Sequence, residues 1–82
     1  MKVAFYFQDR IDGKYETVQS IETDMSYEDI EFFVKHATEP IPVFVEGLEE
    51  FTYTYFSSSF LLAHNGKLVY RVLLRKVNSA ND

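Results

Sequence analysis

The first residues of the chain alternate between apolar and mixed positions. Val3, Phe5 and Phe7 occupy every second position of the segment from Lys2 to Gln8. Because successive side chains of a β-strand point to opposite faces, this spacing predicts a strand with one apolar face.

Asp12-Gly13 follows this segment and is a typical sequence for a two-residue hairpin turn. It predicts a second strand over residues 14–23, antiparallel to the first. Counting outward from the turn places Phe7 opposite Val18 and Asp9 opposite Glu16. The second pair brings like charges together, so a longer loop or a bulge is the alternative.

A second turn signal, Asn65-Gly66, lies between two apolar runs near the end of the chain. A two-residue turn at this point places Leu62 opposite Val69 and Phe60 opposite Arg71. The strand after the turn is apolar on both faces, which predicts a position near the middle of the sheet.

The clearest helix signal begins at Ser26, a residue type that caps helix N-termini, and Asp29 stands at the third helical position of a capping box. Apolar residues then recur with the spacing of one buried helix face. They are Ile30, Phe33, Val34 and Ala37. Pro40 ends the pattern, so the sequence predicts a helix of about three turns over residues 26–38.

The segment after the helix is rich in proline. Pro40-Ile41-Pro42 predicts an extended connector, and Val43–Val45 predicts a short strand at a sheet edge. Phe51–Phe56 alternates and predicts a half-buried strand. Ser57-Ser58-Ser59 is either a break or a bulged continuation into the last hairpin.

Together these elements read β-β-α-β-β-β-β. They predict an α+β fold: a mostly antiparallel sheet of four to six strands, with one α-helix packed on one face. Residues 1–77 form a single domain, and residues 78–82 form a flexible tail.

The composition limits the chemistry. Of 82 residues, 46% are hydrophobic and 17% aromatic, and none is cysteine, which excludes disulfides and thiolate metal sites. The two histidines are isolated, and neither a Gly-rich phosphate loop nor a nucleophile motif occurs. We therefore expect no enzyme activity, no cofactor and no metal. No apolar stretch is long enough to span a membrane, so we expect a cytoplasmic protein without a membrane partner.

Charge is distributed unevenly along the chain. The net charge is −5, which disfavours direct binding to nucleic acid. Acids dominate residues 16–50, whereas residues 51–81 contain no acid. Lys67, Arg71 and Arg75 share the odd-numbered face of the last strand. This face is a candidate docking surface for an acidic or mixed partner; the alternative is that the protein's own carboxylates or solvent neutralise the cations.

Two further groups are candidates for partner binding. Glu46, Glu49 and Glu50 form, with the nearby Glu39, an acidic group. It predicts a solvated loop, or a contact with a basic surface of a partner or of a second copy. Tyr53 and Tyr55 are the other candidates, and packing in the core is the alternative for them.

These patterns predict a non-catalytic interaction protein that self-associates through a face or an edge of its sheet. Its partner is a second copy or another protein. One alternative is an acidic regulator or inhibitor that covers a basic surface of a nucleic-acid-processing protein. Another is a small-ligand-binding domain with an aromatic pocket between helix and sheet. The residues predicted to line that pocket are Phe33, Tyr53, Tyr55 and Tyr70.

Overall fold

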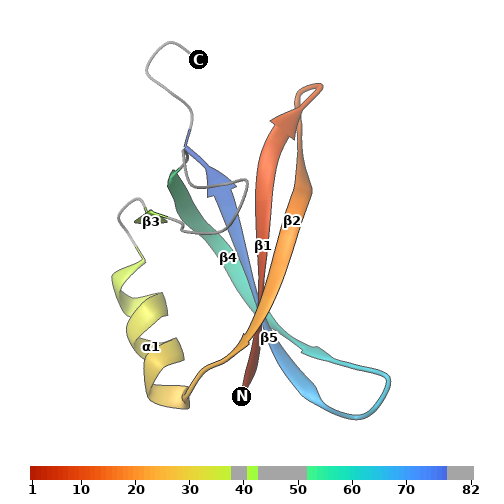
Figure 1. The fold of residues 1–82 in the computed structure, drawn as a ribbon, viewed down its shortest axis with the longest axis vertical. Coiled ribbons are helices and arrows are strands. Elements are labelled where there is room, and N and C mark those ends of the chain that lie inside the picture. Colours follow the sequence, from red (N-terminus) through yellow and green to blue (C-terminus); the bar gives the residue numbers. More distant parts are fainter. Residues whose placement is uncertain (38–40, 43–51, 78–82) are drawn as a thin grey trace.

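The computed structural model describes residues 1–37, 41–42 and 52–77. In chain order its elements are β1 (Lys2–Ile11), β2 (Lys14–Asp24), α1 (Tyr27–His36), β3 (Ile41–Pro42), β4 (Thr52–Leu62) and β5 (Leu68–Lys76). The strands form one sheet in the order β2-β1-β5-β4-β3 (Figure 1). The predicted α+β class, with one sheet and a helix, is confirmed in these residues.

The centre of the sheet differs from the prediction. β1 and β5 run parallel, whereas β1–β2, β4–β5 and β3–β4 are antiparallel, so the sheet is mixed and not mostly antiparallel. The turn sequences predict antiparallel hairpins, in which the two paired strands are adjacent in the sequence. No turn joins the first strand to the last one, so local patterns could not predict their parallel pairing. The predicted central position of the last strand is confirmed.

The first hairpin has the predicted turn and a bulge. Asp12 and Gly13 both have positive φ, 52° and 81°, as a type I′ turn requires. Asp9 lies opposite Glu16 as predicted, but a shift between Phe7 and Gln8 places Phe7 opposite Gln19 and not Val18. The bulge brings Ile21 opposite Phe5, on the face that packs into the core.

The second hairpin has a three-residue loop, not the predicted two-residue turn. The Ala63 N–H donates to the Lys67 carbonyl at 2.9 Å, and the Gly66 N–H donates to the Ala63 carbonyl at 2.9 Å. Gly66 has a φ of 79°, while the Asn65 side chain accepts a hydrogen bond from the Lys67 N–H. This geometry is a turn followed by a glycine bulge, which shifts the register by one residue.

The shift changes which side chains share a face. Phe60 lies opposite Tyr70 and Leu62 opposite Leu68, in place of the predicted partners Arg71 and Val69. Phe60 and Leu62 therefore lie on the face of the sheet that also carries the core. The rings of Phe60 and Tyr70 are 5.0 Å apart.

β4 is one continuous strand with a bulge at Phe56, so Ser57–Ser59 is the bulged continuation and not a break. The predicted connector at Ile41–Pro42 is the edge strand β3, which pairs with Thr52 and Tyr53. The predicted strand at Val43–Val45 and the predicted tail at 78–82 lie outside the described residues.

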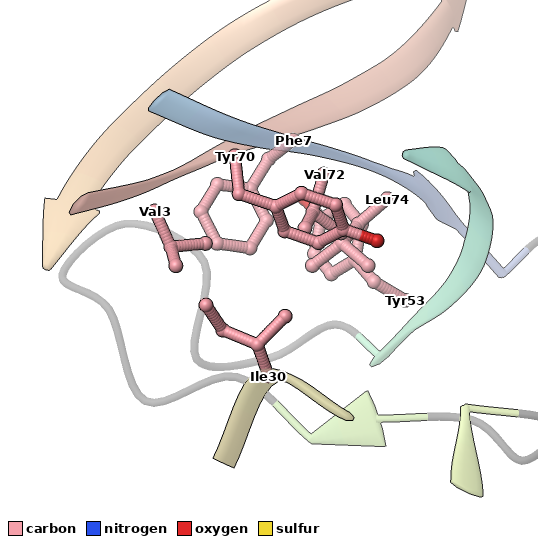
Figure 2. Close-up of a cluster of buried hydrophobic side chains, with 7 residues drawn as sticks. All are labelled: Val3, Phe7, Ile30, Tyr53, Tyr70, Val72 and Leu74. Atoms are coloured by element: carbon pink, nitrogen blue, oxygen red, sulfur yellow. The ribbon is translucent and has the colours of Figure 1, made fainter. Parts of the chain in front are cut away.

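The core lies on the helix-side face of the sheet (Figure 2). Its buried residues are Val3, Phe7, Ile30, Tyr53, Tyr70, Val72 and Leu74. Three of them, Tyr70, Val72 and Leu74, come from the even-numbered face of β5. The rings of Phe7 and Tyr53 meet edge to face with centroids 5.2 Å apart, so aromatic packing joins the first strand to β4.

α1 contacts the core through two of the four residues predicted to form its buried stripe. The Ser26 side chain caps it by accepting a hydrogen bond from the Asp29 N–H at 3.1 Å. Ile30 is buried, and Phe33 meets Phe5 edge to face at 5.6 Å. Val34 is 37% exposed, so the predicted stripe is only partly covered.

We predict that two matched valine substitutions will differ sharply in stability. Val72 is 1% exposed at the centre of the core, whereas Val18 is 47% exposed at the bulge of β2. Val72→Ala should lower the free energy of unfolding by about 2 kcal/mol, because it removes buried methyl groups and leaves a cavity. Val18→Ala should change it by less than about 0.5 kcal/mol. Urea unfolding measures both, and equal losses would contradict the described core.

We also predict a loss of stability at alkaline pH that involves Tyr53. Burial raises the pKa of its phenol above the ordinary value of 10.0, and the negative charge of Asp9 raises it further. The unfolded chain therefore loses this proton at lower pH than the folded chain, and stability falls as the pH rises above 10. Tyr53→Phe should weaken this dependence in urea unfolding at pH values on either side of 10. An unchanged pH profile would contradict the argument.

Candidate interaction surface

The far end of the β4–β5 hairpin projects beyond the rest of the sheet. We name residues 58–69 the hairpin arm; its end projects past β1, whereas residues 58–60 lie opposite β5 residues that still pair with β1. Lys2, the first residue of β1, pairs with Val69, so β1 supplies no neighbour past that point. Figure 1 shows the arm extending away from α1. In the described part of the chain, its loop and the strand ends beside it therefore have no neighbouring strand on the β1 side.

The hairpin arm exposes large apolar side chains on both faces. Phe60 is 55% exposed, Leu62 is 70% exposed and Leu68 is 46% exposed, all on the helix side of the sheet. Leu61, on the other face, is 41% exposed. Single exposed apolar residues are ordinary, but adjacent ones on a projecting element are typical of an interaction site.

An apolar groove runs between α1 and the hairpin arm. Its volume is about 660 Å³. It is lined by Met1, Tyr27, Ile30, Glu31, Val34, Lys35, Phe60 and Tyr70. Tyr27 is 68% exposed at its rim. Phe60 belongs both to the groove and to the arm, so the two form one continuous apolar surface.

The outer edge of β4 adjoins the same surface. From Thr52 to Leu62 this strand carries no charged residue. β3 pairs with β4 only at Thr52 and Tyr53, and among the described residues no strand pairs with the rest of that edge. Unpaired strand edges readily accept another strand unless charge, bulges or a cover prevents it.

The opposite edge of the sheet is protected. β2 carries Lys14, Glu16, Glu22 and Asp24 and is interrupted by a bulge at Val18. Charges and bulges are the devices by which sheet proteins discourage pairing at an edge. β4 also contains a bulge, at Phe56, so charge is what distinguishes the two edges, and the uncharged β4 edge is the one suited to a partner strand.

The two candidate tyrosines are engaged within the protein. Tyr53 is 1% exposed and packs in the core, so it offers a partner no surface. The Tyr55 hydroxyl and the Ser58 Oγ are 2.6 Å apart, and Ser58 in turn bonds the Tyr70 hydroxyl. This chain of three hydroxyl groups ties the start of the arm to the core. Tyr70 is the residue that the predicted ligand pocket and the observed groove have in common.

The two candidate arginines lie on the sheet face opposite α1. The Arg75 guanidinium lies 3.3 Å from the centroid of the Phe56 ring and 4.0 Å from that of Tyr15. Its Nε donates to the Gln8 side-chain oxygen at 3.3 Å. These cation–π contacts join both hairpins. In the described part of the chain, aromatic rings and not carboxylates hold Arg75.

The hydrogen-bonding groups of the Arg71 guanidinium are less fully used than those of Arg75. The Arg71 Nη2 donates to the Ser59 Oγ at 3.5 Å, while the Arg71 Nε is buried with no hydrogen-bond partner among the described residues. Lys67 lies outside β5, beside a polar hollow of about 500 Å³ that Glu22 and Asp24 also line. Lys67 thus lies just before the strand that carries the two arginines. Glu46, Glu49, Glu50 and Glu39 lie outside the described residues.

Sequence reasoning did not select Phe60, Leu62 and the groove residue Tyr27 as partner contacts. One signal was present: no Lys, Arg, Asp or Glu occurs from Phe51 to Gly66, an unusually long uncharged run for a chain with 26% charged residues. Exposure of that run could not be read from the pattern, because apolar residues normally indicate a core.

Other classes of site have no support in the described residues. No group of three or more His, Asp or Glu side chains among them could hold a metal ion. Among the same residues, no helix has the length and apolar character needed to cross a membrane. Comparison of the chain with protein-family models, curated proteins and solved structures finds no match.

We predict that Arg75 stabilises the fold through its stacked position. Arg75→Lys should lower the free energy of unfolding by about 1 kcal/mol, because an ammonium group loses the planar stacking and the bond to Gln8. Arg71→Lys is the matched control on the same strand face and should cost less than about 0.5 kcal/mol. Urea unfolding of both variants tests this, and equal losses would contradict a special role for Arg75.

Proposed function

We propose that this protein is a non-catalytic interaction protein that self-associates through the hairpin arm. The observation that carries the proposal is the exposure of Phe60, Leu62 and Leu68 on one face of a hairpin whose end projects beyond the sheet. Water-exposed apolar surface of this kind is stabilised by burial against a partner.

The charge distribution favours the hairpin arm, which contains no acidic residue, as the contact between copies. Each chain carries a net charge of −5, so two copies repel one another at long range. The arm and the β4 edge contain no Asp or Glu. Contact between copies at these segments therefore does not place their own carboxylates next to each other. A two-fold interface uses the same patch twice, and an apolar patch is complementary to itself.

Fewer observations support the two alternative functions. An acidic inhibitor of a basic partner would depend on Glu46, Glu49 and Glu50, which are outside the described residues. A ligand-binding domain would use the groove, whose lining shares Tyr70 with the predicted pocket but otherwise consists of different residues. Self-association uses the groove, the arm and the edge together.

We predict a dimer that resists salt. Light scattering on a sizing column should give twice the chain mass at about 100 μM protein, with the dimer persisting or tightening between about 50 mM and about 1 M salt. The reason is that salt screens the repulsion between acidic copies and leaves apolar burial intact.

Two results would contradict the proposal. A monomer at all salt concentrations would exclude self-association in this range. A dimer that dissociates in high salt would instead indicate a charged interface, for which Lys67 and Arg71 are the exposed or partly exposed cations to test.

A further inference from the structure

We infer that the second copy binds along the outer edge of β4, so that residues 58–62 of the two chains pair antiparallel about a two-fold axis at Phe60. This inference rests on the proposed self-association and adds the edge, the register and the residues that face one another. The two sheets would then form one continuous sheet.

The direction of the backbone groups in the arm follows from the loop geometry. The Ala63 N–H donates to Lys67 across the hairpin. Along an antiparallel strand, residues alternate between those that bond one neighbour and those that bond the other. Leu61 and Ser59 therefore direct their N–H and C=O groups toward β5. Ser58, Phe60 and Leu62 direct theirs away from it, along the unpaired edge.

The hydrogen bonds of β4 before the bulge at Phe56 agree with this assignment of backbone directions. The Val77 N–H donates to the Thr52 carbonyl at 2.9 Å, so even-numbered residues face β5 at the start of β4. Tyr53 faces outward and pairs with β3. The bulge at Phe56 reverses the parity, which turns the even-numbered residues of the arm outward.

One two-fold register uses every outward-facing residue of the arm. With Phe60 opposite its own copy, Ser58 of each chain lies opposite Leu62 of the other. Each of these residues can both donate and accept, giving about six backbone hydrogen bonds across the joint. Moving the axis to Leu61 leaves Ser58 opposite the loop, and moving it to Ser59 leaves Leu62 opposite the bulge. Both shifts pair fewer groups.

The same register buries the exposed apolar surface. A two-fold axis through an antiparallel strand pair runs perpendicular to the sheet, so equivalent faces of the two chains lie on the same side. The two Phe60 rings meet on the helix side, between the two apolar grooves. Each copy then continues the groove wall of the other, and the buried area extends beyond the paired strands toward the roughly 800 Å² per partner of a standard interface.

The charge pattern argues for β4 and against β2 as the joint. The paired segment of β4 is uncharged, so no like charges meet. A two-fold pairing of β2 centred on Gln19 would place Glu16 opposite Glu22 twice, next to the bulge at Val18. Like charges directly opposite one another destabilise a strand pair.

Amide hydrogen exchange tests the register directly. In the ¹⁵N-labelled protein, the amides of Leu61 and Ser59 should be protected at every protein concentration, because they bond β5. The amides of Ser58, Phe60 and Leu62 should gain at least about tenfold protection as concentration rises through the dimerisation range. Protection of these three that is independent of concentration would mean that another part of the same chain covers the edge, and would overturn the inference.

A charge-swap experiment tests the two-fold axis at Phe60. Phe60→Lys and Phe60→Glu each place like charges opposite one another in a homodimer, and each should raise the dimer dissociation constant at least about tenfold. An equimolar mixture should form a heterodimer that weakens with salt. Val18→Lys, at a similarly exposed position on the β2 edge, is the matched control and should leave the dimer unchanged. Circular dichroism verifies that each variant is folded.

The outcomes separate this inference from the proposed function. A wild-type dimer whose mass is unchanged by either Phe60 substitution would leave self-association standing and overturn the β4 edge as its site. A wild-type dimer disrupted by Val18→Lys would also overturn it, in favour of β2. A wild-type monomer would remove both the inference and the proposed function.

Discussion

The pairing of the first strand with the last is the interaction on which the rest of the structure depends. β1 and β5 lie side by side in parallel, with Val3 opposite Tyr70 and Phe7 opposite Leu74. Each hairpin buries little by itself, because an isolated two-stranded ribbon has one neighbour per strand. Joining them places both central strands between two neighbours and creates the surface on which Ile30 of the helix packs. The free energy gained by this pairing must offset the conformational entropy lost when nearly the whole chain is closed into a loop.

The same register explains why an apolar element is left uncovered. Because β1 begins opposite Val69, the hairpin between β4 and β5 extends past the end of its neighbour. α1 is short and contacts the core through Ile30 and Phe33, which leaves a groove between the helix and the arm. The offset therefore exposes Leu62 and Leu68, whereas Phe60, opposite Tyr70, is exposed beside the groove.

The two edges of the sheet are chemically unlike, and this asymmetry links structure to function. Both edge strands contain a bulge, but the β2 edge is charged, whereas the β4 edge is uncharged along its length. Arg75, on the strand next to β4, makes its contacts within the protein. Its guanidinium stacks on the rings of Tyr15 and Phe56 and so connects the two hairpins on the face opposite the helix. Among the described residues, the edge of β4 beyond β3 is consequently uncharged and without a paired strand.

The sequence by itself determined the local features: the turn at Asp12-Gly13, the cap at Ser26 and the buried even-numbered face of β5 each depend on residues close together in the chain. Tertiary structure decided the parallel β1–β5 pairing and the bulge that turns Ile21 into the core, because both depend on burial against distant strands. It also decided the candidate surface. A loop one residue longer than expected moved Phe60 and Leu62 to the helix side, and the strand offset left Leu62 past the end of β1. Side-chain pattern indicates which residues are apolar, but what covers them depends on how the strands are placed.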